Sequence, residues 1–430
     1  MKMKINIRRK CAVWVLVILS FVYIFNPRVV SIDLRKIVDV LSYLFIFFEL
    51  YKMNWKVKVS QKIKNILMPF ALFLMYQFIN AMAHVVIGGG NLVCVGEYVT
   101  LLIFLIRTAL IVIALTLYMK DEKLNYTDWL FVIFACAIIQ LVCVMGSLVV
   151  PSVRSQFLAW NLANSNSENI AIYSKYVTDH GYGLCENLYD SFGYIISLII
   201  CMMFVFGIEN DRMKLIIISF ICILMPALNS RTGILFCLVG MAITLLKYSK
   251  KIILQKGIRY IILFAIVLGV MAVAYTFVPE DTKEWVQSGY NDIFSLMAAG
   301  EKTGFFSAII KGLSYPTNIL FGAGASPDGL GFTHTDIGYV QCIWRYGIIG
   351  TVMILLSYAN LFIKMYKWSN IYKYLKCYAL CAGVIFFLYL YKLYSLGNMG
   401  ANIIIFSNVG FLLLKDYDTS FFDNKNKPWT

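Results

Sequence analysis

Residues 215–246 read LIIISFICILMPALNSRTGILFCLVGMAITLL, which is two apolar runs separated by the polar segment 229–233. A helix that crosses the ~30 Å hydrocarbon core of a bilayer needs ~20 mainly apolar residues. The whole stretch is therefore too long for one membrane-spanning helix, and it suits a helical hairpin whose tip carries the polar residues. It predicts that the chain spans a membrane.

The composition of the 430-residue chain agrees. Hydrophobic residues make up 60% of it and charged residues 14%, whereas soluble domains hold about 45–50% apolar and ~25% charged residues. The mean hydropathy is +0.75. These values argue against a soluble enzyme, a disordered tail and a secreted disulfide scaffold. Despite the formal net charge of +15, they also exclude a nucleic-acid-binding protein. We predict an all-α polytopic membrane protein with a single integral membrane domain over residues 1–430.

Hydropathy and length together predict about twelve transmembrane helices. The first follows a basic start, and no small-residue cleavage site follows its apolar run, so we interpret it as a helix rather than a signal peptide. The expected spans lie near 11–26, 36–51, 66–87, 96–118, 129–150, 190–208, 213–229, 232–248, 259–279, 336–362, 377–393 and 399–414.

The positions of the basic residues predict the orientation of the spans. Most of the 38 Lys and Arg residues fall in segments that are cytoplasmic if the N-terminus is inside, among them 52–65 and 247–259. Because cytoplasmic loops are enriched in Lys and Arg, both termini are expected to be cytoplasmic. Two long extracytoplasmic loops then remain, at 151–189 and 280–335. Loops of this length are usually functional or disordered, so we expect the chemistry on the extracytoplasmic side.

Arg231 lies at the tip of the predicted hairpin, within the sequence Asn-Ser-Arg-Thr-Gly. A guanidinium in this low-dielectric position binds phosphate strongly through its planar fork of donors. An arginine that only marks the turn and extends toward water fits the spacing equally well. The spacing alone leaves both interpretations open.

A second polar segment precedes the tenth span. Residues 320–331 read LFGAGASPDGLG, and Phe332-Thr333-His334-Thr335-Asp336 follow directly. The glycines permit tight turns and close backbone approach. Thr335 or Asp336 suits the N-cap of the next helix, which places His334 beside a carboxylate. Such a histidine can remove a proton from a sugar hydroxyl near neutral pH. A loop histidine next to a capping acid is the alternative.

Two arginines fall inside predicted spans. Arg345 lies nine residues after Asp336, which is ~13 Å along a helix, and Arg107 lies near the middle of the fourth span. A charge at this depth requires a polar cavity or a partner, so both are candidates for substrate binding. The alternative is pairing with another helix, through Asp39 or Glu49.

The loop 151–189 contributes Arg154 and the run Asp179-His180-Gly181-Tyr182-Gly183. Polar and aromatic groups interleaved with glycine would suit a sugar-lined surface, and equally any ordered loop. The sequence has no GxxxxGK[ST] motif, so it does not indicate an ATP-driven pump. It also lacks HExxH and multi-Cys/His motifs, and we therefore expect neither metal nor cofactor.

These segments together resemble the Wzy-type polymerases of oligosaccharide repeat units (of O-antigen, capsule or exopolysaccharide) and the related O-antigen ligases. The resemblance rests on NSRTG at 229–233, DHGYGLCEN at 179–187 and the segment 319–350, and it covers roughly residues 150–350. It implies a membrane glycosyltransferase of GT-C-like architecture in the bacterial cytoplasmic (inner) membrane, with its active site facing outward. Both donor and acceptor would be undecaprenyl-diphosphate-linked oligosaccharides, with a chain-length regulator and a flippase as further partners.

The resemblance also implies roles for single residues. Arg231 matches an arginine thought to bind the donor diphosphate, and His334, with Asp336, matches the base proposed for the ligases. Related proteins often carry an Arg where this chain has Asp179-His180, which puts a two-arginine clamp in doubt. The expected substrate-binding residues are Arg345, Arg154, Arg107, His180, Tyr182 and Tyr339. The alternatives to a polymerase are a polysaccharide ligase, or a flippase or other transporter of lipid-linked oligosaccharides.

Overall fold

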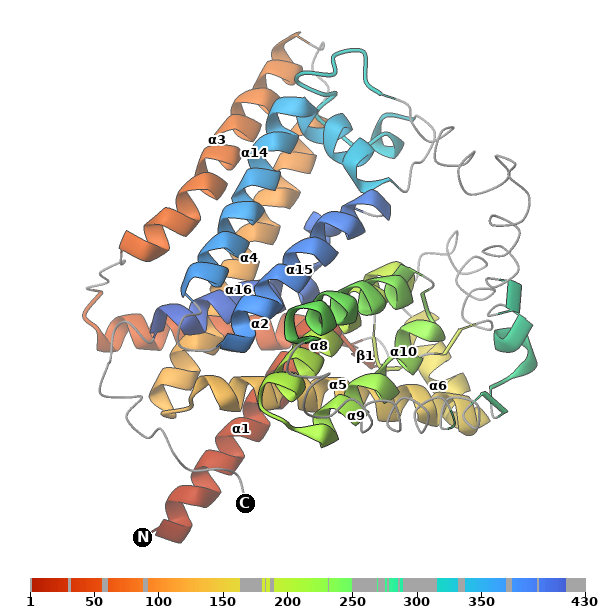
Figure 1. Cartoon of the computed structure of the whole chain (residues 1–430). Helices are drawn as coiled ribbons and strands as arrows, with labels where there is room; N and C mark the ends of the chain where they lie inside the picture. Colours follow the sequence, from red (N-terminus) through yellow and green to blue (C-terminus); the bar gives the residue numbers. More distant parts are fainter. Residues whose placement is uncertain are drawn as a thin grey trace. The chain divides into compact units, whose positions relative to one another are not determined.

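The computed structural model is almost entirely helical in its described residues (Figure 1). Seven of the helices described are long and apolar enough to cross a membrane. The predicted class, an all-α membrane protein, is thereby confirmed. The structure describes residues 2–29, 32–55, 61–87, 92–162, 180–181, 183–185, 189–230, 232–249, 269, 275–276, 278–284, 287–288, 315–331, 337–368, 373–392 and 394–414.

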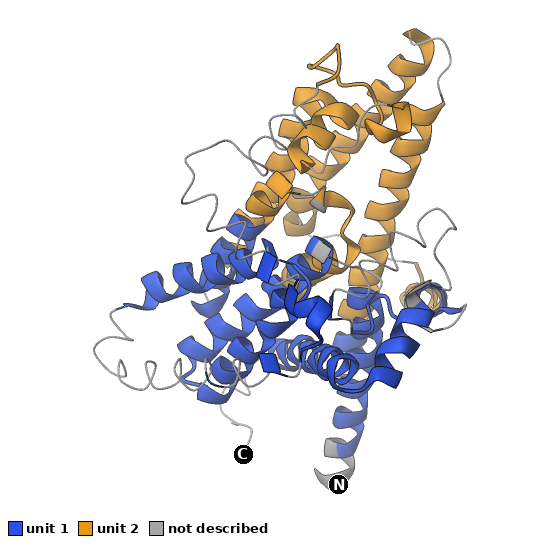
Figure 2. Ribbon diagram, turned by 90° about the vertical axis from the view of Figure 1, so that its right-hand side faces the viewer, with its two compact units in different colours: residues 1–42, 118–299, 372–385 blue, residues 43–117, 300–371, 386–430 orange. Residues whose placement is uncertain are grey.

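The chain divides into two compact units, drawn in different colours in Figure 2. Unit 1 comprises residues 1–42, 118–299 and 372–385, and unit 2 comprises residues 43–117, 300–371 and 386–430. Unit 1 contains α1 (Lys2–Phe25), the two-residue strands β1 (Arg28–Val29) and β2 (Ile32–Asp33), α5 (Tyr126–Val149), α6 (Pro151–Leu162), α8 (Tyr189–Glu209), α9 (Met213–Cys222), α10 (Leu224–Ala227) and the helix Thr232–Ser249.

Unit 2 is built on three helices: α3 (Gln61–Ile87), α14 (Gly338–Trp368) and α16 (Met399–Leu414). It also holds the short 3₁₀ turns η1 (Asp328–Leu330) and η2 (Ser395–Gly397). Three helices contribute residues to both units, namely α2 (Leu34–Lys52), α4 (Val93–Asp121) and α15 (Lys373–Lys392).

Eleven of the twelve predicted spans coincide with described helices. The predicted span 213–229 is formed by α9 and α10 in succession, and the predicted span 259–279 lies largely outside the described residues. The predicted loop 151–189 begins with a helix, α6. The hydropathy pattern therefore located the helices well, because long apolar runs are the strongest signal in a membrane sequence.

In unit 1, α8 forms the core through small residues that allow close helix approach. A Cβ atom placed on Gly193 would lie 3.0 Å from the Cα of Gly233, and one placed on Gly240 would lie 2.1 Å from the Sγ of Cys201. The Ser197 hydroxyl donates to the Gly233 carbonyl at 3.0 Å. Small residues and hydroxyl groups are common at such interfaces, since packing and hydrogen bonds hold membrane helices together.

An ion pair joins the start of α1 to the start of α5. Nη2 of Arg9 donates to both carboxylate oxygens of Asp128, at 3.0 and 2.8 Å. The Asp128 side chain is fully buried, and it also accepts the Asn125 backbone N–H at 2.8 Å. The Asn125 side chain in turn accepts from the Asp128 N–H at 3.0 Å, which completes a capping box. The Asp128 carboxylate therefore both caps the N-terminus of α5 and joins α5 to α1.

In unit 2, α3 packs along α14 through aromatic side chains. Phe70 lies edge-on to Tyr358 at 5.3 Å between ring centroids, and Phe73 lies edge-on to Tyr346 at the same distance. The Tyr358 hydroxyl donates to Oδ1 of Asn402 in α16 at 2.8 Å. These contacts bury large apolar surfaces and give each buried hydroxyl a partner, as aromatic packing requires.

A break at Gly347 divides α14, which corrects the prediction of one uninterrupted span over 336–362. Gly347 has φ +65° and ψ 178°, and a Cβ atom there would lie 2.1 Å from the Leu320 carbonyl oxygen. Only glycine fits both the positive φ and this approach. The N–H groups of Ile348 and Ile349 donate to the carbonyls of Ile319 and Leu320, at 2.9 and 3.3 Å.

The segment 319–323 thus replaces the missing turn of α14. The exchange is mutual, since the Ala323 N–H donates to the Trp344 carbonyl at 2.7 Å. The Tyr76 hydroxyl donates to the Tyr346 carbonyl at 3.1 Å. Non-helical backbone at membrane depth is stable only where its polar groups find such partners. The sequence pattern did not reveal this break, because the compensating groups come from a segment that precedes α14.

We predict that Arg9→Ala lowers the free energy of unfolding in detergent by about 2 kcal/mol, because it leaves the buried Asp128 carboxylate without its cation. Arg8→Ala is the matched control: Arg8 pairs with Glu122 at 3.1 Å but its side chain is 75% exposed, and exposed pairs add little. Thermal unfolding monitored by intrinsic fluorescence distinguishes the two variants. Equal effects would contradict a special role for the Asp128 pair.

We further predict that Gly347→Ala greatly reduces the yield of folded protein and its melting temperature, because the methyl group collides with the Leu320 carbonyl. Gly96→Ala in α4 is the control, since no atom lies within 4 Å of its added Cβ. The control should be neutral or stabilising by ~0.5–1 kcal/mol. Size-exclusion chromatography and thermal unfolding provide the measurement. A well-folded Gly347→Ala protein would show that the break is unnecessary.

Candidate functional site

The hairpin tip in unit 1 is anchored by one carboxylate. The Ser230 hydroxyl donates to Oδ1 of Asp190 at 2.7 Å, and the Thr232 hydroxyl donates to the same oxygen. The Ser230 hydroxyl oxygen also accepts the Gly233 N–H at 2.9 Å, at the start of the next helix. Asp190 lies in the first turn of α8. The residues on either side of position 231 are therefore both fixed to the same neighbouring helix.

The segment around His180 joins this tip. The Gly181 N–H donates to the Leu228 carbonyl at 3.2 Å, and a Cβ atom on Gly181 would lie 3.2 Å from that of Leu228. His180 is only 3% exposed. Gly181 of the predicted motif 179–183 thus contacts Leu228, the residue directly before the predicted motif 229–233.

The same segment continues to a buried amide in α5. A Cβ atom on Gly183 would lie between 2.2 and 3.0 Å from three atoms of the Gln140 amide. Gln140 is fully buried, and neither of its amide atoms has a hydrogen-bond partner among the residues that the structure describes. An unsatisfied buried amide is costly, by ~1–3 kcal/mol for each group. Gly183 leaves the space in which this amide lies.

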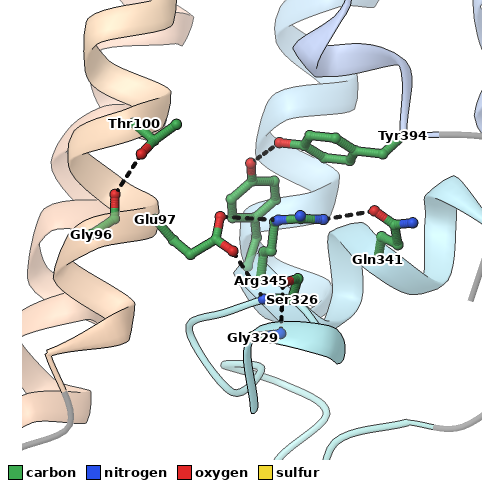
Figure 3. A network of polar contacts seen from close by, with 9 residues as sticks. Gly96, Glu97, Thr100, Ser326, Gly329, Gln341, Arg345 and Tyr394 are labelled. Carbon is green, nitrogen blue, oxygen red and sulfur yellow. Dashed lines mark hydrogen bonds and ion pairs between the residues drawn. The ribbon is translucent and has the colours of Figure 1, made fainter. Parts of the chain in front are cut away.

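A second polar cluster lies in unit 2, centred on Arg345 (Figure 3). Nε of Arg345 donates to Oε2 of Glu97 in α4 at 3.3 Å, and Nη1 donates to Oε1 of Gln341 at 2.8 Å. The guanidinium carbon lies 4.3 Å from the centroid of the Tyr394 ring. Oε1 of Glu97 accepts the Ser326 N–H at 3.4 Å. The cluster joins α4, α14 and Ser326, which follows the segment 319–323 that compensates the break at Gly347.

Tyr394 follows α15 and closes one side of this cluster. Its hydroxyl shares a hydrogen bond with that of Tyr346. Burial raises the pKa of the Tyr394 hydroxyl, so the ring stays neutral and offers its face to the Arg345 cation.

Four predicted site residues, Arg231, Tyr182, His334 and Asp336, lie outside the described residues. His180 lies beside the hairpin tip in unit 1, and Arg345 is the centre of the polar cluster in unit 2. Arg154 lies half-buried in α6, and Arg107 half-buried in α4. The Tyr339 hydroxyl donates to the Phe387 carbonyl at 2.8 Å, which joins α14 to α15.

The partner of Arg345 differs from the predicted candidates. Arg345 pairs with Glu97, whereas Glu49 pairs with Lys52, three residues away on its own helix. Pairing with another helix was the alternative predicted for this arginine, and the acid is Glu97 in α4 rather than Asp39 or Glu49. Glu97, Asp190 and Tyr394 were all missed. An acidic residue at the start of an apolar run was the available signal for Glu97 and Asp190.

No group of three or more His, Cys, Asp or Glu residues in the described part of the chain could hold a metal ion. No family model, curated protein or solved structure matches the chain.

We predict that Asp190→Ala loosens the hairpin tip. Loss of hydrogen bonds worth ~1.5 kcal/mol each to a charged acceptor should raise amide hydrogen exchange over residues 228–234 by about tenfold or more. Asp190→Asn is the matched variant, because its amide oxygen can still accept from Ser230 and Thr232, and it should preserve most of the protection. If Asp190→Ala exchanges like the wild type, Asp190 does not anchor the tip.

Proposed function

We propose that the chain is a membrane glycosyltransferase that polymerises undecaprenyl-diphosphate-linked oligosaccharide repeat units into a surface polysaccharide. In this proposal all twelve spans cross the bacterial cytoplasmic membrane in a GT-C-like arrangement, both termini are cytoplasmic, and the reaction takes place at the outer face. The resemblance of three segments to Wzy-type polymerases is the starting point.

One observation carries the proposal: the segment 180–183 and the hairpin tip meet in unit 1. Gly181, next to His180, donates its N–H to the Leu228 carbonyl directly before the tip, so both motifs are placed where they can act on one ligand. The tip is fixed through Ser230 and Thr232, which suits a residue between them that must hold a ligand in one geometry. A pre-organised cation is what binding of a diphosphate leaving group requires.

The proposed reaction needs neither metal nor nucleotide. Arg231, with Arg154 as a second cation, binds the donor diphosphate. His334, oriented by Asp336, accepts the proton of the acceptor's sugar hydroxyl, whose oxygen attacks the anomeric carbon. The bond from that carbon to the lipid diphosphate breaks with inversion, and the diphosphate leaves with the bonding electrons. Its negative charge is stabilised by the arginines.

The proposal predicts that the purified protein makes a ladder of glycans from lipid-linked repeat units without added metal. His334→Ala and Arg231→Ala should each lower the rate by ~10²-fold or more, the range expected for removal of a general base or an electrostatic stabiliser. Arg212→Ala is the matched control, because Arg212 is exposed at the start of α9 and should keep full activity. Gel electrophoresis of the products is the measurement.

Full ladder formation by both the His334 and the Arg231 variants would overturn this assignment. A polysaccharide ligase differs only in its acceptor, and it would transfer a finished chain once rather than extend it stepwise.

A flippase or other transporter of lipid-linked oligosaccharides is the second candidate, since the break at Gly347 gives α14 a discontinuous form. Discontinuous membrane helices often form transport sites near the bilayer midplane. Proteoliposomes loaded with labelled lipid-linked repeat unit separate the two functions: a transporter moves the unchanged molecule between leaflets and makes no longer glycan.

A further inference from the structure

The guanidinium of Arg345 is held by three unequal contacts (Figure 3). The contacts with Gln341, at 2.8 Å, and with the Tyr394 ring, at 4.3 Å from its centroid, are both close. Together they fix the plane of the guanidinium. The contact with Glu97 is a single bond of 3.3 Å through Nε, whereas strong charge-assisted pairs are bidentate at ~2.7–2.9 Å.

Glu97 is therefore a poor match for the cation that it neutralises. Its side chain is 28% exposed, while that of Arg345 is 15% exposed. Its other oxygen accepts the Ser326 N–H at 3.4 Å, which is also long. Two weak bonds and partial exposure leave this carboxylate easy to displace. By contrast, the two close contacts of Arg345 do not depend on Glu97.

The Glu97 carboxylate bridges two donors in the way a phosphate group would. Its oxygens lie against a guanidinium on one side and a backbone N–H on the other. Backbone N–H groups combined with an arginine fork are a common set of donors for phosphate oxygens. A diphosphate carries more charge and more acceptor oxygens than a carboxylate, so it would bind the same donors more strongly.

We propose that Arg345 and the Ser326 N–H form an oxyanion site within unit 2, which Glu97 occupies in the free protein and a diphosphate group occupies in the complex. Binding exchanges one anion for another, and the displaced carboxylate turns toward its exposed side. Glu97 thereby sets the affinity of the site, and it keeps the buried arginine neutralised when no substrate is present. The identity of the diphosphate carrier rests on the proposed function; the anion site does not.

In a polymerase, the diphosphate that binds this site could belong to either of two substrates. Donor and acceptor are both lipid-linked in the proposed reaction, so each brings a diphosphate, although only that of the donor leaves. A single cationic site cannot hold two diphosphates. The cluster around Arg345 has donors of its own, and it is suited to hold one of them.

Inorganic pyrophosphate binding to the purified full-length protein tests the exchange. Glu97→Gln should bind pyrophosphate about tenfold more tightly than the wild type, the change that ~1.4 kcal/mol produces. Arg345→Gln should remove this gain when combined with Glu97→Gln, which ties the effect to one site. Glu122→Gln is the matched control, since Glu122 pairs with the exposed Arg8, and it should leave the affinity unchanged.

A Glu97→Gln protein that binds no more tightly, or whose gain survives in the double variant, would overturn the proposal. If Glu97→Gln does not fold, Glu97→Asp serves instead. It keeps the charge but withdraws the carboxylate by one methylene, so it should give a smaller gain. A purely structural ion pair predicts lower melting temperatures in both variants and no change in pyrophosphate affinity.

A free oligosaccharide acceptor without lipid diphosphate separates the two sources. If Arg345 binds the acceptor's diphosphate, Arg345→Gln should match the wild-type rate with this acceptor and be slow only with the lipid-linked one. If it binds the donor's diphosphate, the variant should be slow with both. The binding results and the ladder assay are independent: tighter pyrophosphate binding without any ladder would retain the anion site and reject the polymerase.

Discussion

The backbone exchange at Gly347 is the constraint on which unit 2 depends. A break in a membrane helix leaves N–H and C=O groups that lipid cannot satisfy. Here the carbonyls of Ile319 and Leu320 and the N–H of Ala323 take the place of the missing helical partners. The exchange fixes the segment that leads to Ser326, and Arg345 lies two residues before the break. The polar cluster is thus a consequence of how the break is compensated.

Unit 1 meets the same constraint without breaking a long helix. Glycines at 193, 233 and 240 let α8 and the helix Thr232–Ser249 approach until their backbones touch. Side-chain hydrogen bonds then join the two helices. The Ser197 hydroxyl donates to the Gly233 carbonyl, and Asp190 accepts hydrogen bonds from the Ser230 and Thr232 hydroxyls of the tip. Close approach and polar anchoring are coupled, because the hydroxyls reach their acceptors only when the helices lie this near.

The sequence predicted the helices better than it predicted the contacts between them. Apolar runs give the spans directly, since each run must match the thickness of the bilayer. The break in α14 is different, because it depends on a segment that precedes the helix and on a glycine that also suits an intact helix. The partner of Arg345 was missed for a similar reason: the sequence offers several acids near span ends, and only the three-dimensional position of Glu97 at the start of α4 selects it.

Two arginine–carboxylate pairs, Arg9–Asp128 and Arg345–Glu97, show why pairing alone does not reveal a role. Asp128 is fully buried, contacts Arg9 through both oxygens at 2.8 and 3.0 Å, and also caps α5. Removing it would undo three contacts at once, so it belongs to the fold. Glu97 makes one long bond to Arg345 and one long bond to a backbone N–H, and more than a quarter of its side chain is exposed. The arginine would keep its close contacts without it. A carboxylate that neutralises the arginine through long bonds alone is one that another anion can replace.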